Sequence, residues 1–179
     1  MTSAEFAILS LIVELPRHGY EIEQIIEERG MREWTEVSFS SIYYLLKKLE
    51  KKSLIISRTE PSAKRGPARK VYQITTAGMD ACHKATVEAL KTPHLCYAPI
   101  QLGLSNLSQL SVAEAVTTLR QRHNGLIERL VHVQARRETQ QPLPYFVEAV
   151  FDYSLTMIEV EKKWIEKFIH QLEETDVKN

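Results

Sequence analysis

The sequence predicts a mainly α-helical protein that carries one small β-hairpin. Apolar residues recur at helical spacing through most of the 179 residues, and this periodicity is typical of helices with one buried face. Two β-prone runs, Leu54–Ile56 and Val71–Ile74, flank a segment with one glycine and two prolines, a pattern that favours a hairpin with a long tip. Two Ser/Thr-x-x-Glu sequences, at Thr2 and Ser111, indicate helix starts in separate regions of the chain.

The composition is that of an ordinary globular protein, with 44% hydrophobic residues, 26% charged residues and no formal net charge. No apolar run reaches the roughly 18 residues of a membrane span. Glu5 interrupts the first apolar run, which argues against a secretory signal, and we expect a cytoplasmic protein. Cys82 and Cys96 are too few for a disulfide framework or a zinc site. We expect reduced structural thiols, although their spacing does not exclude a redox pair.

The first predicted helix follows the capping box of Thr2 and Glu5 and is apolar nearly all round, which indicates burial. Pro16 to Gly19 ends it, and Gly19 opens a second helix in which isoleucines alternate with glutamates that we expect to face solvent. A connector then carries Trp34, whose bulk suits a lid or the wall of a ligand site, although core or interface packing is the more usual role of a lone tryptophan.

The third predicted helix is short and half polar, with Ser38 or Ser40 as its expected N-cap. One narrow apolar stripe should face a core, namely Ile42, Leu45, Leu46 and Leu49. The opposite face holds polar side chains, namely Ser40, Tyr44, Lys47 and Lys51. The flanks carry Tyr43 and Glu50 on one side and Ser41 and Lys48 on the other.

Charge is divided sharply along the first half of the chain. Between residues 40 and 75 there are nine basic and two acidic side chains, a net of +7, whereas residues 1–39 carry three basic and eight acidic side chains, a net of −5. Lysines on a helix face often do no more than solvate it. Here they coincide with serine and tyrosine side chains and with a basic hairpin, a combination that favours binding to a polyanion such as DNA.

Two sequence blocks resemble the signature of the PadR family of winged-helix transcriptional regulators: SFSSIYYLLKKLEKKSLI at 38–55 and GPARKVYQITTAG at 66–78. Departures from the family pattern are Ser40-Ser41 in place of the frequent Gly-Thr, Tyr44 in place of a common proline, and Ser53 where glycine usually ends the helix. These departures leave the fold prediction intact and leave the operator sequence open.

The resemblance implies an N-terminal winged helix-turn-helix and a C-terminal antiparallel helical dimerisation module. We expect a DNA-binding domain over residues 1–80, a linking helix and hinge over 81–110, and a dimerisation domain over 111–179. His18 and Tyr20 match the family where the second helix nears the DNA backbone, so they are candidate phosphate contacts. A role in the turn and its packing explains them equally well.

The predicted DNA contacts follow from the exposed face of the third helix and from the wing. Candidates for base edges are Ser40, Tyr44 and Lys47, and candidates for phosphates are Ser41, Tyr43, Lys48 and Lys51. The wing candidates are Lys64, Arg65, Gly66 and Lys70.

Two long helices are predicted from Val112 toward Arg137 and from Tyr145 to Leu172. The second carries an apolar face broader than one antiparallel neighbour covers, which predicts a homodimer. The expected interface residues are Phe146, Val150, Tyr153, Met157, Val160, Trp164 and Phe168.

The leading hypothesis is a homodimeric, sequence-specific repressor on an inverted-repeat operator, with half-sites about 34 Å apart. The resemblance also implies a small aromatic effector, such as a phenolic acid, bound between the two domains. Its candidate lining is Trp34, His94, Tyr97, Phe151 and Tyr153, which structural roles explain as easily. The alternative is a winged-helix adaptor that binds proteins without reading DNA. Scattered histidines and the lack of any catalytic signature argue against an enzyme, and we expect no metal and no cofactor.

Overall fold

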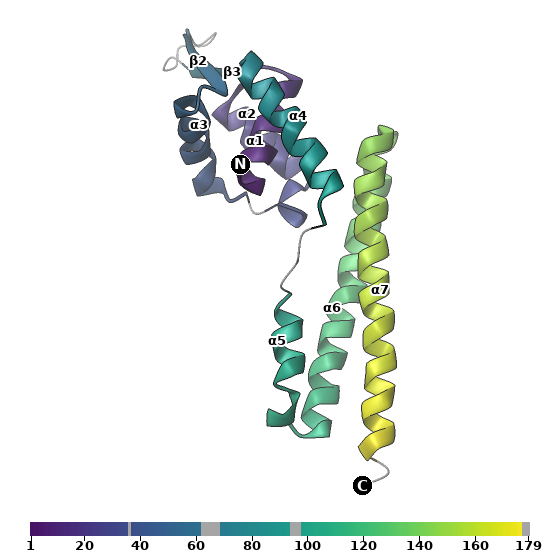
Figure 1. Ribbon diagram of the computed structural model, residues 1–179. Helices are drawn as coiled ribbons and strands as arrows, with labels where there is room; N and C mark the ends of the chain where they lie inside the picture. Colours follow the sequence, from purple (N-terminus) through teal and green to yellow (C-terminus); the bar gives the residue numbers. More distant parts are fainter. Residues whose placement is uncertain (36, 62–68, 94–97, 177–179) are drawn as a thin grey trace. The chain divides into compact units, whose positions relative to one another are not determined.

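The computed structural model describes residues 1–35, 37–61, 69–93 and 98–176. They form two compact units, Met1–Leu95 and Cys96–Asn179. The fold is mainly helical with a small antiparallel sheet, which confirms the predicted fold class (Figure 1). The prediction of a hinge over 81–110 stays a prediction.

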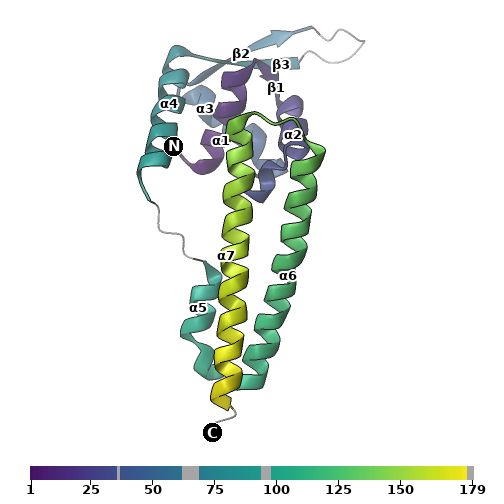
Figure 2. The same ribbon diagram turned by 90° about the vertical axis from the view of Figure 1, so that its right-hand side faces the viewer.

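Helices α1 (Ser3–Glu14), α2 (Gly19–Glu28), α3 (Ile42–Lys51) and α4 (Thr76–Lys91) build the N-terminal unit, with short 3-10 turns η1 (Met31–Glu33) and η2 (Phe39–Ser41). The strands are β1 (Arg17–His18), β2 (Ile55–Glu60) and β3 (Arg69–Ile74), in the order β1-β3-β2 and all antiparallel. In Figure 2 the β2–β3 hairpin extends away from the helices as a wing.

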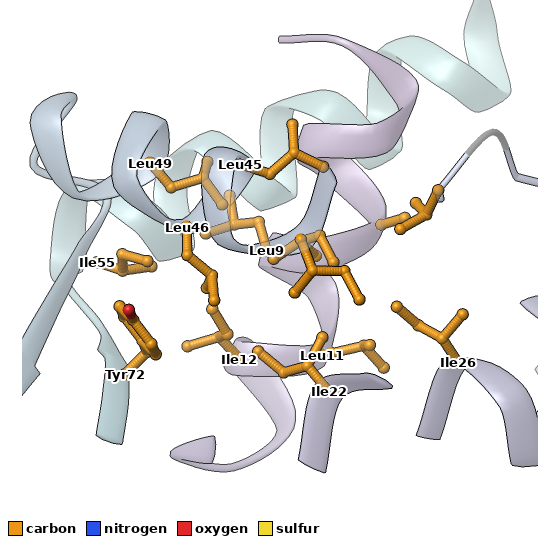
Figure 3. Packing of buried hydrophobic residues seen from close by; sticks show 14 of the residues in the cluster. Leu9, Leu11, Ile12, Ile22, Ile26, Leu45, Leu46, Leu49, Ile55 and Tyr72 are labelled. Carbon is orange, nitrogen blue, oxygen red and sulfur yellow. The ribbon is translucent and has the colours of Figure 1, made fainter. Parts of the chain in front are cut away.

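The core of this unit is a cluster of fully buried aliphatic side chains around α1 (Figure 3). Leu9 and Ile12 of α1 meet Leu46 of α3 on one side and Ile22 of α2 on the other. The predicted stripe of α3 is buried, since Ile42, Leu45, Leu46 and Leu49 are at most 5% exposed. The apolar stripe thereby orients the polar face of α3 outward.

The turns at the ends of α3 and α4 depend on a few specific contacts. Ser53 follows α3 with a φ of 57°, a left-handed conformation that favours glycine. The serine at this position therefore carries the strain that the usual glycine avoids. Thr75 caps α4 by accepting a 3.0 Å hydrogen bond from the Gly78 backbone N–H.

One local prediction was wrong. Neither Ser38 nor Ser40 caps α3, because the 3-10 turn η2 precedes the helix and puts Ser41 at the N-cap without a side-chain cap bond. The Ser41 hydroxyl instead donates to the Ser38 carbonyl at 2.7 Å. Hydroxyl groups that bond to nearby backbone compete with regular capping.

The C-terminal unit contains α5 (Pro99–Ser105), a 3-10 turn η3 (Leu107–Gln109), and the long helices α6 (Val112–Thr139) and α7 (Tyr145–Asp176). Leu119, Leu126 and Val133 of α6 are buried against Ile158 and Ile165 of α7. Their spacing of seven residues along each helix is that of a coiled-coil seam. Ion pairs across the two helices, such as Arg120 with Glu173 at 2.7 Å, run in antiparallel register.

The capping boxes predicted at both helix starts are confirmed. The Thr2 and Ser111 hydroxyls accept from the Glu5 and Glu114 backbone N–H groups, and each glutamate reaches back to the N-cap backbone. These two local motifs set where α1 and α6 begin.

Candidate nucleic-acid interface

The solvent-facing side of α3 presents aromatic and cationic side chains together. Tyr43 and Tyr44 are 54% and 64% exposed, and Lys47 and Lys51 are exposed one turn apart on the same face. Among the described residues neither Lys47 nor Lys51 is in an ion pair. Ser40 is exposed just before the helix, in η2. The face therefore offers hydroxyl groups and uncompensated positive charge.

The other two lysines of this region are engaged. The ammonium groups of Lys48 and Lys52 lie 3.0 Å and 2.8 Å from Oε1 of Glu5, a carboxylate on α1. Glu5 is only 1% exposed, and its Oε2 accepts a 2.9 Å hydrogen bond from the Thr2 backbone N–H. In each of the adjacent pairs Lys47–Lys48 and Lys51–Lys52, the second lysine is therefore bonded to Glu5 and the first is not.

Electrostatics around Glu5 favour its charged form. Burial would raise the pKa of the Glu5 carboxyl, but hydrogen bonds from Lys52, the Thr2 backbone and Lys48 lower that pKa to about 2. The Glu5 carboxylate in turn raises the pKa of Lys48, mainly through their hydrogen bond. Glu5 and Lys48 are therefore both charged near neutral pH.

The start of α2 lies against the side of α3. A Cβ on Gly19 would come within 2.7 Å of Cε1 of Tyr43, so glycine permits this close approach. His18 belongs to β1, beside β3, where its Nδ1 lies 3.2 Å from the Lys70 carbonyl oxygen. Tyr20 is 64% exposed. The pairing of β1 with the hairpin had no signal in the sequence, because a two-residue strand has no periodicity.

The wing adds further positive charge. Lys70 is exposed on β3, and its ammonium is a loose 3.9 Å from Oε2 of Glu50. Arg58 of β2 donates to the Gln73 side-chain oxygen at 2.9 Å. The predicted tip contacts Lys64, Arg65 and Gly66 lie outside the described residues.

The arginines that flank α2 are neutralised by glutamates. Arg17 and Arg29 both pair with Glu14, and Arg32 pairs with Glu23 and Glu27. Among the described residues of this unit, exposed cations outside ion pairs lie on α3 and on the hairpin, and also on α4 at Lys84 and Lys91.

The predicted effector residues are divided between the two units, and their grouping stays a prediction. Trp34 is 52% exposed at the end of η1, and His94 and Tyr97 fall outside the described residues. Phe151 packs against the core of the C-terminal unit, whereas Tyr153 is exposed on α7.

Burial raises the pKa of the Cys82 thiol, consistent with a structural role.

The predicted dimer residues do share one surface. On α7 a line of exposed apolar side chains recurs at alternating spacings of four and three residues, which keeps them on one face: Phe146, Val150, Tyr153, Met157, Val160 and Trp164. Phe168 differs, because it is partly buried against the core and its ring stacks on Trp164 at 5.1 Å. We refer to the six exposed residues as the α7 stripe.

Neither a membrane-spanning helix nor a metal-binding cluster occurs among the described residues. No helix there combines the length and apolar character that crossing a bilayer requires. No group of three histidine, cysteine, aspartate or glutamate side chains there is arranged to hold a metal ion.

The N-terminal unit is similar to known sequences. Residues 8–84 match the model of the transcriptional regulator PadR-like family. A protein of Lysinibacillus sphaericus that is described as uncharacterized is 37% identical over 71 residues. The aligned region spans 40% of this chain and 63% of the length of the relative.

Comparison with solved structures extends over both units. Bacillus subtilis PadR in complex with operator DNA matches with a TM-score of 0.78 at 23% identity, covering 94% of this chain and 98% of that chain. The same protein with p-coumaric acid matches at 0.81 and 21%, covering 96% and 99%. Smu.1604c of Streptococcus mutans matches at 0.70 and 20%, covering 94% and 99%. At these identities the likeness establishes a common fold.

Proposed function

Because residues 8–84 of this chain match the model of the PadR-like family of transcriptional regulators, we propose that the protein is a homodimeric repressor that binds an inverted-repeat DNA operator. The winged helix-turn-helix inserts α3 into the major groove, and the wing contacts the flanking backbone. Each protomer reads one half-site, and the pairing of the C-terminal units sets the distance between half-sites.

The observation that carries this proposal is the uncompensated positive charge of α3. Lys47 and Lys51 are exposed without an ion pair among the described residues, on the face opposite the buried leucines. Hydroxyl groups of Ser40 and Tyr44 extend the same face. Phosphate contacts from lysine supply affinity, and contacts to base edges supply sequence preference. The solved complex of Bacillus subtilis PadR with operator DNA supports the assignment by likeness of fold.

Lys47→Ala should weaken operator binding by about 1 to 3 kcal/mol and relax sequence preference, because Lys47 lies in the middle of the groove-facing side. Lys51→Ala is the matched control, because loss of a phosphate contact near the helix end should weaken binding to all duplexes about equally. The measurement is fluorescence anisotropy on the upstream sequence of the protein's own gene and on scrambled DNA, over a range of salt. Equal losses for both variants on both duplexes would show that their roles are assigned wrongly.

The same titration separates the rival functions. Binding that is sequence-selective and falls steeply with salt supports a DNA-reading regulator. Absence of any salt-dependent binding to duplex DNA would favour the protein-binding adaptor.

Addition of p-coumaric acid, the compound bound in the solved Bacillus subtilis structure, tests release by an aromatic effector. Unchanged DNA binding, together with no thermal stabilisation by a panel of phenolic acids, would remove the effector from the proposal.

Met157→Glu should disrupt the homodimer, because Met157 is 50% exposed at the centre of the α7 stripe. A charge buried in an apolar interface should cost about 2 kcal/mol or more of association free energy. His170→Glu is the control, because His170 is exposed on α7 and lies about 140° round the helix from Met157. Analytical ultracentrifugation should then find Met157→Glu monomeric at concentrations where the wild type and His170→Glu are dimeric. A monomeric wild type would contradict the dimer.

A further inference from the structure

The Glu5 carboxylate joins the first turn of α1 to two successive turns of α3. Its Oε1 lies 2.8 Å from Nζ of Lys52 and 3.0 Å from Nζ of Lys48, which are four residues apart and therefore on one side of the helix. Its Oε2 is held by the Thr2 backbone N–H of the capping box. The carboxylate is thus oriented from one helix and bonded to the other.

Burial makes this cluster different from a surface ion pair. Glu5 is 1% exposed, so removing either its charge or its partners leaves a buried polar group with fewer bonds. The side chains of Lys48 and Lys52 are 38% and 43% exposed, which leaves them within reach of solvent. Shared between them, the single negative charge reduces two cations to a net charge of +1. A DNA phosphate would have to compete with Glu5 for each ammonium.

We propose that Glu5 is a positioning and specificity-determining residue for DNA binding, because it withholds Lys48 and Lys52 from phosphates and leaves that role on α3 to Lys51, beside the base contact of Lys47. This inference rests on the proposed function. Non-specific affinity comes almost entirely from phosphate contacts, so fewer available lysines lower binding to arbitrary DNA. Base contacts from the same helix are unaffected. Discrimination between operator and other DNA therefore increases.

The two pairs of adjacent lysines allow a matched experiment. Lys47→Gln, Lys48→Gln, Lys51→Gln and Lys52→Gln are compared by the salt dependence of binding to a scrambled duplex. Lys51→Gln should reduce the log–log salt slope by about 0.9, the value for one lost phosphate contact, whereas Lys47→Gln should act mainly on operator binding through its base contact. Lys48→Gln and Lys52→Gln should leave the slope unchanged. Equal reductions in all four variants would overturn the inference.

Glu5→Gln tests the residue directly. Release of both lysines should steepen the slope on scrambled DNA by up to about 1.8, twice the value for one phosphate contact, and lower the ratio of operator to scrambled affinity. Adding Lys48→Gln and Lys52→Gln to Glu5→Gln should return the slope to the wild-type value. A merely structural role would lower the melting temperature without steepening the slope, and that result would reject the inference. If Glu5→Gln does not fold, the four lysine variants still decide.

The outcomes separate this inference from the function on which it rests. A wild-type protein with no salt-dependent binding to duplex DNA fails the proposed function itself. A wild-type protein that binds its operator, with four lysines that contribute equally, keeps the proposed function and loses only the assignment to Glu5.

Discussion

Gly78→Ala should destabilise the N-terminal unit by about 3 kcal/mol, toward the upper end of the cost of overpacking a close-packed site. A Cβ at this position would lie 2.0 Å from the Leu54 carbonyl oxygen and 2.5 Å from Cδ1 of Ile74. The carbonyl cannot move aside easily, because it accepts hydrogen bonds from the Thr75 backbone N–H at 3.1 Å and the Thr75 hydroxyl at 3.0 Å. The alanine therefore strains the junction of the wing and α4.

Urea unfolding followed by circular dichroism measures this loss. Gly125→Ala in α6 is the matched control, because an added Cβ there meets no atom within 4 Å. Alanine is the better helix former by about 1 kcal/mol, so the control should be neutral or stabilising. If Gly78→Ala unfolded at the same urea concentration as the wild type, the close approach of α4 to Leu54 would be wrong.

Acid should remove the stability that Glu5 provides. The folded-state pKa of Glu5 is lowered from its ordinary value of 4.5 to about 2, so the ionised carboxylate stabilises the folded state. Because the pKa is lower in the folded state, the contribution of Glu5 to the free energy of unfolding is complete above pH 4.5 and is lost as the pH falls toward 2. A difference of this size corresponds to about 3 kcal/mol.

The expected measurement is the free energy of unfolding at pH 7, 4.5 and 3 for the wild type and Glu5→Gln. The wild type should exceed the variant most at pH 7, and the difference should shrink below pH 4.5, because the variant has no carboxyl to protonate at this position. A difference that stayed constant down to pH 3 would show that the ionised form of Glu5 contributes nothing to stability.

The elements that local patterns encode were predicted well. The α3 stripe from Ile42 to Leu49 is buried as its spacing predicts, and the two runs that flank the turn-rich segment form β2 and β3. Thr2 and Ser111 start helices as capping boxes. All these signals come from residues within a few positions of one another, where backbone geometry alone fixes which side chains are neighbours.

The candidate DNA-binding site was predicted in outline from one feature of the same kind. The helical spacing of Lys47 and Lys51 relative to Leu46 and Leu49 places lysines opposite leucines before any tertiary contact is known. The same spacing predicted the α7 stripe from Phe146 to Trp164. In each case a period of 3.6 residues separates the buried face from the exposed one.

The amino-acid sequence thus established the helices, the hairpin, the exposed basic face and the wide apolar face of α7. Folding in three dimensions was needed to distinguish Lys48 and Lys52 from their neighbours, because their partner Glu5 lies on another helix more than forty positions earlier. The close approach of Gly78 to Leu54 and the pairing of β1 with β3 are of the same kind. Contacts between residues distant along the chain depend on how whole elements pack, and the periodicity of a single sequence shows which face of an element is buried but not which residues cover it.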